Sequence, residues 1–150
     1  RELQLLVGQR VRAAGEQAGG GCRQPATVDS VNERIHFLKM EGKEVYKNAV
    51  TAMTAAAKDV LDRSGVSIED IKCIIPHQAN QRIISAIGDR LGAREDQVFV
   101  NLQKYGNTSA ASVAIALDEA IEQGQVERGD LILLLVFGAG LTWGAAVIEW

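Results

Sequence analysis

Apolar side chains in this chain recur with two different periods, and the change from one to the other predicts helices that alternate with strands. Between residues 43 and 63 they recur at spacings of three and four, as on one broad face of a helix. Ser64 and Gly65 follow directly and are expected to end this helix. The stretches 79–92 and 107–124 show the same spacing, and each closes on a glycine. We therefore predict three long helices.

Short apolar runs between and after these helices predict strands. They cover residues 73–77, 97–101, 131–137 and 142–150, and the loosely alternating stretch 3–11 predicts a first strand or hairpin. Strands that alternate with helices favour a mostly parallel sheet with helices on its faces. The last two runs are joined by Gly-Ala-Gly and predict an antiparallel hairpin. The pattern thus predicts a layered α/β fold with a mixed, mostly parallel five-stranded sheet that ends in this hairpin.

The segment 13–26 interrupts this order. It contains four glycines and a proline, which predicts a loop. We therefore divide the chain into residues 1–27, a partial strand with a glycine-rich connecting loop, and residues 28–150, which hold the main domain.

Composition and charge argue against several classes of protein. The chain has 150 residues, 47% of them hydrophobic, and a formal net charge of −3, so nothing favours nucleic acid as a partner. Cys22 and Cys73 form neither a CxxC pair nor a metal-ligand spacing, and two cysteines favour a reducing cytoplasm over a disulfide framework. The apolar run 131–141 is too short and too rich in glycine to span a bilayer, so no membrane is expected. The chain opens on a strand-like stretch without methionine, which is consistent with part of a longer protein.

A histidine and an asparagine follow two of the predicted strands. His77 ends the strand 73–77, and Asn107 comes shortly after the strand 97–101. Because the carboxyl ends of parallel strands meet at one edge of a sheet, both side chains are expected there. Two N–H donors aimed at one point would form an oxyanion hole, which stabilises negative charge on a carbonyl oxygen. The alternatives are a histidine with a purely structural role and an asparagine that only caps a helix.

Four short motifs are more specific than the apolar pattern. They are PHQAN with Arg82 behind it, YGNTSAAS, FGAGLTWG and MEGKEVYKNAV. In these motifs the chain resembles the C-terminal half of β-ketoacyl-acyl-carrier-protein synthase III, the CoA-primed condensing enzyme of type II fatty acid synthesis. The resemblance runs from about Val28 to Trp150, and residues 1–27 match only loosely. It implies half of a thiolase-type fold, with residues 28–150 as a C-terminal condensing-enzyme domain.

The resemblance also implies a decarboxylative Claisen condensation. A short acyl-CoA such as acetyl-CoA acylates a cysteine, and malonyl-acyl-carrier protein then loses CO2 and attacks the thioester. His77 and Asn107 would form the oxyanion hole for the malonyl thioester, whereas the elongating condensing enzymes carry two histidines. The substrates acetyl-CoA and malonyl-acyl-carrier protein imply no further cofactor and no metal. The complete enzyme would be a homodimer in the cytoplasm.

Binding residues are assigned by the same resemblance. The contact with the acyl carrier protein would be formed by Gln78, Ala79, Asn80, Gln81, Arg82 and Lys47. The channel for CoA and pantetheine would be lined by Gly42, Tyr46, Ala79 and Asn80. Gly138 and Gly140 would let a tight turn approach the active site. For each charged residue the alternative is a solvated helix face, and Tyr46 is equally readable as a core aromatic residue.

The sequence departs from the family pattern in two places. Gln81 stands where an apolar residue is common. The nucleophilic cysteine of the family lies at a helix start in its N-terminal half, and neither Cys22 nor Cys73, a strand residue read as small and buried, has that context. We therefore expect an inactive half-enzyme, with its alanine-rich helices packed on an absent N-terminal half. Two alternatives stay open: a non-catalytic thiolase-fold module that binds acyl carrier or CoA, and a polyketide-type priming synthase with a bulkier starter.

Overall fold

The structure, a computed structural model, describes residues 4–9, 15–16 and 19–150. The described elements are β1 (Gln4–Gln9), β2 (Gly15–Glu16), α1 (Val28–Asn32), β3 (Lys39–Met40), α2 (Gly42–Ser64), η1 (Ile68–Asp70), β4 (Ile71–Pro76), α3 (Gln81–Leu91), η2 (Glu95–Gln97), α4 (Leu102–Tyr105), α5 (Ala111–Glu122), β5 (Leu131–Gly138) and β6 (Thr142–Glu149). η1 and η2 are short 3₁₀ turns. From α2 onward helices and strands alternate as the apolar pattern predicts, with one exception after α3.

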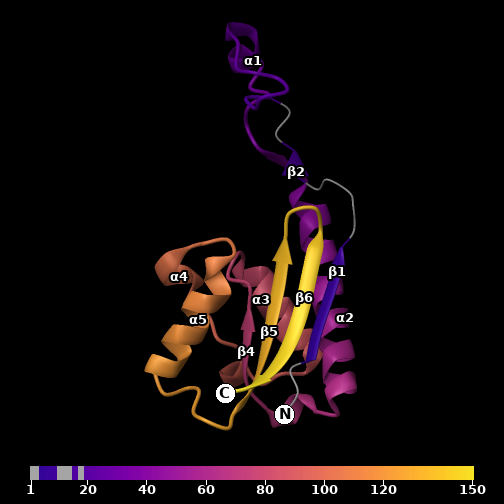
Figure 1. The fold of residues 1–150 in the computed structure, drawn as a ribbon, viewed down its shortest axis with the longest axis vertical. Helices are drawn as coiled ribbons and strands as arrows, with labels where there is room; N and C mark the ends of the chain where they lie inside the picture. Colours follow the sequence, from indigo (N-terminus) through magenta and orange to yellow (C-terminus); the bar gives the residue numbers. More distant parts are fainter. Residues whose placement is uncertain (1–3, 10–14, 17–18) are drawn as a thin grey trace.

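The main sheet contains four strands among the described residues, in the order β1-β6-β5-β4 (Figure 1). β4 and β5 run parallel, whereas β1 and β5 each pair with β6 in the antiparallel direction. The predicted mixed sheet and its closing hairpin are confirmed, with Leu131 opposite Glu149 and Gly138 opposite Thr142. The prediction of five strands in a mostly parallel sheet is wrong, because one of the three strand pairs of this sheet is parallel and two are antiparallel.

The predicted strand 97–101 does not form a regular strand ladder, because the side-chain amide of Gln78 binds backbone groups that would otherwise pair with a neighbouring strand. Its pairing with β4 is one parallel bridge at Ile74, where Phe99 N–H donates to Ile74 O over 2.9 Å. Beyond the bridge, Gln78 Nε2 donates to Phe99 O over 3.2 Å, and Gln78 Oε1 accepts from Asn101 N–H over 3.0 Å. The run lies beside β4 as expected, but a glutamine satisfies its polar groups in place of a full strand pairing.

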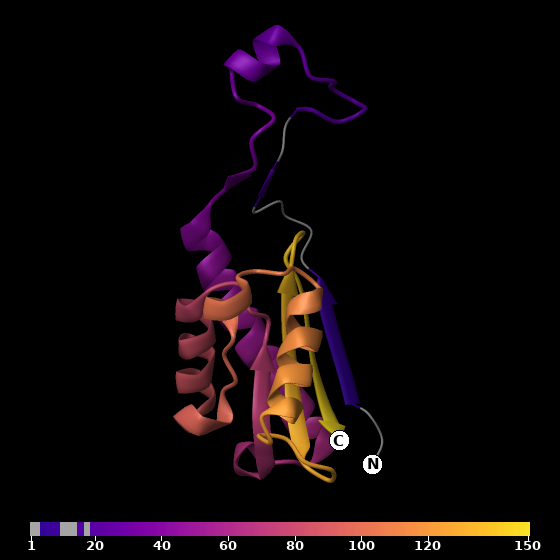
Figure 2. The ribbon, with the colours of Figure 1, turned by 90° about the vertical axis from the view of Figure 1, so that its left-hand side faces the viewer.

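Helices cover the two faces of the main sheet unequally (Figures 1 and 2). On one face α2 and α3 enclose the larger core, around Met53 and Leu133. On the other face α5 packs over β4 and β5 around Ile75. Val136 of β5 shares this second face and is 44% exposed. The predicted layers are therefore present, but the α5 face is only partly covered by the described chain.

The helix predicted over 43–63 is confirmed as α2, and it packs on the sheet of this chain. Gly65 caps it with φ of 63°, the left-handed conformation expected of a C-terminal glycine. Ala49, Ala56 and Ala57 are at most 2% exposed, and α2 contacts β1, β5, β6 and α3. The expectation that the alanine-rich face of α2 packs on an absent N-terminal half is therefore wrong. Neither α2 nor any other helix in the described part of the chain is long and apolar enough to cross a membrane.

Residues 19–40 extend away from the end of the main sheet (Figures 1 and 2). β2 pairs with β3. Thr27 is the N-cap of α1, and its Oγ1 accepts from Ser30 N–H over 3.1 Å. Exposed apolar side chains in this extension include Val28 (78%) and Leu38 (70%). β1 covers most of the stretch 3–11, and the rest of that stretch lies outside the described residues. The division at residue 27 stays a prediction.

Candidate active site

His77 directly follows β4 in the chain. Because β4 and β5 run parallel, both strands finish at the same end of the sheet (Figure 1), and His77 begins the turn at that end. Its backbone N–H donates to Leu135 O over 2.7 Å, which anchors the residue to β5 just beyond Pro76, where the strand pairing ends. The side chain is half-buried, and burial lowers the pKa of His77 below its ordinary value. The imidazole is therefore neutral at pH 7, with one ring N–H donor and one acceptor nitrogen.

The ring of His77 contacts a serine that sequence reasoning did not select. His77 Nδ1 lies 2.5 Å from Ser112 Oγ, which also accepts from Gln78 N–H over 3.2 Å. Ser112 is 2% exposed and belongs to the first turn of α5. In the sequence, the available signal was a hydroxyl residue within the YGNTSAAS motif, about one helical turn beyond Asn107. The contact engages Nδ1, so Nε2 is the ring nitrogen left for another partner.

Asn107 lies in the turn that leads into α5. Its Oδ1 accepts from Ser109 N–H over 2.9 Å, so the amide oxygen is engaged and the Nδ2 group is the end left to donate. Ser112 N–H donates to Ser109 O over 3.2 Å. Since Ser112 contacts His77, the segment 107–112 reaches the same end of the sheet as His77. The convergence of both N–H donors on one oxygen stays a prediction.

A carboxylate of α5 fixes the chain that precedes Asn107. Glu119 accepts from Asn101 Nδ2 over 2.8 Å and from Lys104 Nζ over 2.6 Å, and 8% of the residue is exposed. The hydrogen bonds from Lys104 and Asn101 lower the pKa of Glu119, and the bond to Glu119 raises the pKa of Lys104. Both groups therefore stay charged at neutral pH. The ion pair ties α4 to α5, which restricts the turn between them.

The structure corrects the role assigned to Gln78. The residue is 1% exposed, and its side chain binds backbone groups of Pro76, Phe99 and Asn101 over 2.8, 3.2 and 3.0 Å. A side chain buried and bonded in this way has no surface to offer to a carrier protein. Gln78 instead links the end of β4 to the segment 99–101.

The other residues assigned to carrier contact lie where α3 begins. Asn80 is its N-cap, and Asn80 Oδ1 accepts from Arg82 N–H over 2.9 Å. Gln81 and Arg82 are exposed, whereas Ala79 is half-buried. The Arg82 guanidinium lies 5.9 Å from the centre of the Tyr46 ring, so the starts of α2 and α3 meet at the surface.

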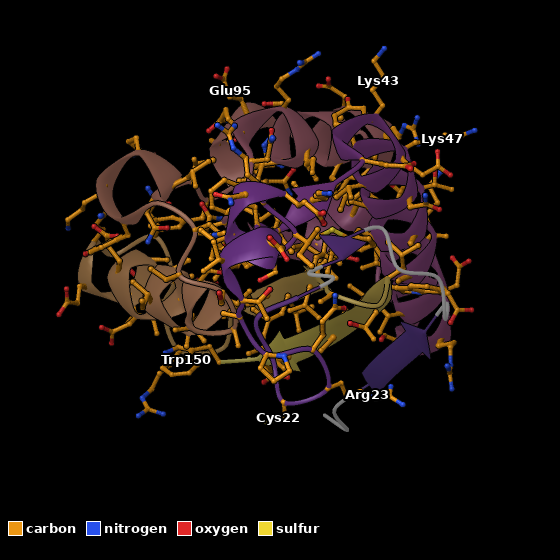
Figure 3. All side chains as sticks on the ribbon, turned by 90° about the horizontal axis from the view of Figure 1, so that it is seen from above. Cys22, Arg23, Lys43, Lys47, Glu95 and Trp150 are labelled. Carbon is orange, nitrogen blue, oxygen red and sulfur yellow. The ribbon has the colours of Figure 1, made fainter. Side chains whose placement is uncertain are left out.

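Lysines extend the positive charge along α2. Lys43 and Lys47 are exposed and project outward from this helix (Figure 3). Tyr46 is 37% exposed and lies outside both cores of the described chain, and Gly42, the first residue of α2, is also exposed. We call the surface formed by Lys43, Tyr46, Lys47 and Arg82 the α2–α3 patch.

The turn of the β5–β6 hairpin lies at the same end of the sheet as His77 (Figure 1). Gly140 has φ of 73°, and the next residue, Leu141, has φ of 51° although it carries a side chain. Leu141 is 5% exposed, so burial of its side chain offsets the cost of this conformation. A Cβ on Gly138 would stand 3.2 Å from Thr142 Oγ1. Both glycines suit this tight turn, and its approach to a substrate stays a prediction.

The described cysteines do not resemble a catalytic thiol. Cys73 is 2% exposed in the smaller core, as the sequence suggested, and burial raises the pKa of its thiol to about 11. The thiol is therefore protonated at pH 7. Cys22 is exposed in the extension 19–40. In the described ranges, no three His, Cys, Asp or Glu side chains lie close enough together to hold a metal ion.

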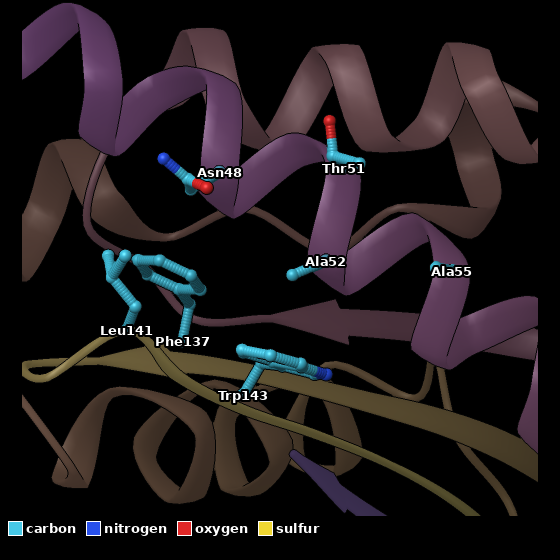
Figure 4. A pocket seen from close by; sticks show the side chains of 7 residues that line it. All are labelled: Asn48, Thr51, Ala52, Ala55, Phe137, Leu141 and Trp143. Atoms are coloured by element: carbon cyan, nitrogen blue, oxygen red, sulfur yellow. The ribbon is translucent and has the colours of Figure 1, made fainter. Parts of the chain in front are cut away.

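A pocket of about 230 Å³ opens between α2 and the β5–β6 hairpin (Figure 4). It is lined by Asn48, Thr51, Ala52, Ala55, Phe137, Leu141 and Trp143. The large side chains of the hairpin face the smaller ones of α2 across it (Figure 4). Its lining contains Phe137 and Trp143 of the FGAGLTWG motif but neither His77 nor Asn107, so it is separate from the predicted donor pair.

Sequence comparisons agree on one family. The family model described as 3-oxoacyl-[acyl-carrier-protein (ACP)] synthase III C terminal matches residues 61–150. The β-ketoacyl-[acyl-carrier-protein] synthase III of Caldanaerobacter subterraneus subsp. tengcongensis is 55% identical over 131 residues, which cover 87% of this chain and 40% of that protein. The chain thus spans 40% of the length of this relative.

Solved structures share the fold along nearly the whole chain. The 3-oxoacyl-[acyl-carrier-protein] synthase III from Aquifex aeolicus VF5 superposes with a TM-score of 0.81 at 40% identity, covering 99% of this chain and 43% of that one. The priming β-ketosynthase from the R1128 polyketide biosynthetic pathway has a TM-score of 0.75 at 32% identity, over 97% and 43% of the two chains. The thiolase-type α/β fold implied by the motifs is confirmed.

Proposed function

This chain belongs to the 3-oxoacyl-[acyl-carrier-protein] synthase III family, and on that premise we propose that it is the C-terminal half of an acyltransferase that starts fatty acid synthesis. The complete enzyme would condense acetyl-CoA, or another short acyl-CoA, with malonyl-acyl-carrier protein. The observation that carries the proposal is the contact between His77 and Ser112, which brings the turn bearing Asn107 to the carboxyl end of β4. Two N–H donors at that position suit a thioester oxygen that becomes negative.

In the proposed reaction, His77 and Asn107 act on the malonyl thioester. When CO2 leaves, the electron pair of the broken C–C bond forms an enolate, and its negative charge falls on the thioester oxygen. His77 Nε2–H and Asn107 Nδ2–H donate to that oxygen and stabilise the charge as it develops. The enolate carbon then attacks the acyl thioester, and the cysteine thiolate leaves. That cysteine would come from outside this chain.

The α5 face of the sheet is the proposed site for the N-terminal half of the same enzyme. Val136 is 44% exposed there, and on α5 itself Ala111 and Ala114 are exposed. Exposed apolar residues on a sheet face and on the helix that covers it suit burial by a partner. The chain spans 40% of its relative, so a segment long enough to cover this face exists in that protein. Assembly as a homodimer in the cytoplasm stays a prediction from the resemblance.

The α2–α3 patch is the proposed contact for the acyl carrier protein. Lys47 and Arg82 are exposed cations, and they suit an acidic helix or the phosphate of phosphopantetheine. Gln81 and Asn80 lie beside Arg82 at the start of α3 and are assigned to the same contact. The pantetheine channel is assigned to the same region, to Gly42, Tyr46, Ala79 and Asn80.

Arg82→Glu in the full-length protein is expected to weaken carrier-protein binding about tenfold at low ionic strength, because repulsion replaces attraction at an interface rim. Titration calorimetry at several salt concentrations measures the effect. Arg63→Glu serves as the control, because it makes the same charge change in the last turn of α2, whereas the α2–α3 patch lies at the start of this helix. Equal losses in both variants would indicate a general charge effect and remove Arg82 from the contact.

The proposed function is tested by intact-mass measurement after incubation with acetyl-CoA. The full-length protein is expected to gain one acetyl group, and the 150-residue chain none. Cys73 is buried with a protonated thiol, and Cys22, although exposed, lies in a glycine-rich loop and not at the helix start where a catalytic cysteine is expected. An adduct on the short chain would contradict the assignment of the nucleophile. If neither protein gains acetyl, incubation with bulkier acyl-CoA starters tests a second candidate function, a polyketide-type priming synthase. The similarity to the priming β-ketosynthase of the R1128 pathway favours this candidate. No adduct with any starter would favour a non-catalytic binding module.

A further inference from the structure

We propose that Ser112 is a positioning residue that sets the tautomer of His77, so that the ring proton lies on Nε2. The inference rests on the proposed function, because it deepens the role of His77 as a donor to the thioester oxygen. It is drawn from the hydrogen bonds of one buried hydroxyl group.

Ser112 Oγ has two partners in the described structure. His77 Nδ1 lies 2.5 Å away, and Gln78 N–H donates to the oxygen over 3.2 Å. A backbone N–H only donates, so the serine oxygen accepts from Gln78. The hydroxyl proton also needs an acceptor, because Ser112 is 2% exposed. Of the two groups bonded to Oγ, only His77 Nδ1 is able to accept it.

The opposite tautomer would leave a polar atom unsatisfied. With the ring proton on Nδ1, Ser112 Oγ would accept from His77 and from Gln78 at once. Its own proton would then have no acceptor among the groups bonded to it. A buried donor without an acceptor is unfavourable. The hydrogen-bond pattern therefore favours donation from Ser112 to Nδ1 and places the ring proton on Nε2.

The tautomer decides what Nε2 presents to a substrate. A neutral imidazole has one proton, so Nε2 is either a donor or a lone pair. A donor stabilises the negative charge that develops on a thioester oxygen, whereas a lone pair repels it. Ser112 thus acts on the proposed reaction through His77, without touching the substrate itself.

The same turn also orients the second proposed donor. Ser109 N–H donates to Asn107 Oδ1 over 2.9 Å, and Ser112 N–H donates to Ser109 O over 3.2 Å. The segment 107–112 therefore controls the tautomer of His77 and the direction of the Asn107 amide together.

The test compares Ser112→Ala with Ser112→Thr in the full-length protein. Ser112→Ala is expected to slow malonyl decarboxylation about tenfold, less than loss of the donor itself. Acyl transfer from acetyl-CoA should fall less. Nitrogen-15 NMR of labelled histidine reports the tautomer, and His77 should change from the Nε2–H form to a mixture. Ser112→Thr retains the hydroxyl and should restore both the rate and the Nε2–H signal.

Two results would overturn the inference. One is a wild-type rate with an unchanged tautomer in Ser112→Ala. The other is an equal loss of rate in the Ala and Thr variants with the Nε2–H signal intact, which would make Ser112 a packing residue only. His77→Ala separates this failure from failure of the proposed function. If His77→Ala leaves decarboxylation intact, the oxyanion role itself is wrong; if it abolishes decarboxylation while Ser112→Ala does not, only the role of Ser112 is lost.

Discussion

His77→Ala in the full-length protein is expected to slow malonyl decarboxylation by at least about 100-fold, the usual effect of losing one oxyanion-hole donor. Acylation of the nucleophile by acetyl-CoA should fall much less, because that step does not require the malonyl enolate. Burial lowers the pKa of His77, so the wild-type side chain enters the reaction neutral at pH 7. Release of CO2 from malonyl-acyl-carrier protein and acetyl transfer from acetyl-CoA, measured separately, distinguish the two steps.

Asn107→Ala should show the same pattern as His77→Ala, since both residues are assigned to one oxygen. The matched control is His36→Ala, because His36 is the other histidine of the chain and lies in the extension 19–40. It is expected to decarboxylate malonyl-acyl-carrier protein at the wild-type rate. If acetyl transfer fell as strongly as decarboxylation in the His77 and Asn107 variants, the two residues would not form the malonyl oxyanion hole.

Gln78→Leu is expected to lower the free energy of unfolding by about 3 kcal/mol, because it leaves buried backbone groups without partners. The lost bonds are those to Pro76 O, Phe99 O and Asn101 N–H, and they hold the end of β4 against the segment 99–101. Urea unfolding followed by circular dichroism measures the change. The segment carries few other backbone pairings, so the effect should be larger than for an average hydrogen bond.

Gln81→Leu provides the control for this prediction. The substitution is chemically the same, but Gln81 is exposed at the start of α3, and the stability should change by no more than about 0.5 kcal/mol. Equal and small effects of both substitutions would show that the buried amide of Gln78 contributes nothing. If Gln78→Leu instead weakened binding of the carrier protein and left the stability unchanged, Gln78 would have to be assigned to the carrier contact despite its burial.

Local patterns in the sequence were sufficient for most elements. The apolar period predicted α2, α3 and the β5–β6 hairpin, and Gly65 and Gly92 end their helices with φ of 63° and 71°. These features depend on residues within one or two turns of each other, so each is specified by a short stretch of chain. The motifs around His77, Asn107 and Gly140 likewise identified the family before any geometry was known.

The tertiary structure alone decided what depends on distant partners. The run 97–101 has the composition of a strand, yet Gln78 binds its backbone from more than 20 residues away. The same bonds bury Gln78, which the motif had placed on a binding surface. The contact between Ser112 and His77 joins residues 35 positions apart. Apolar periodicity records which side of an element faces the core, but it does not record which polar atoms meet there, because hydrogen bonds require positions that only the packed chain provides.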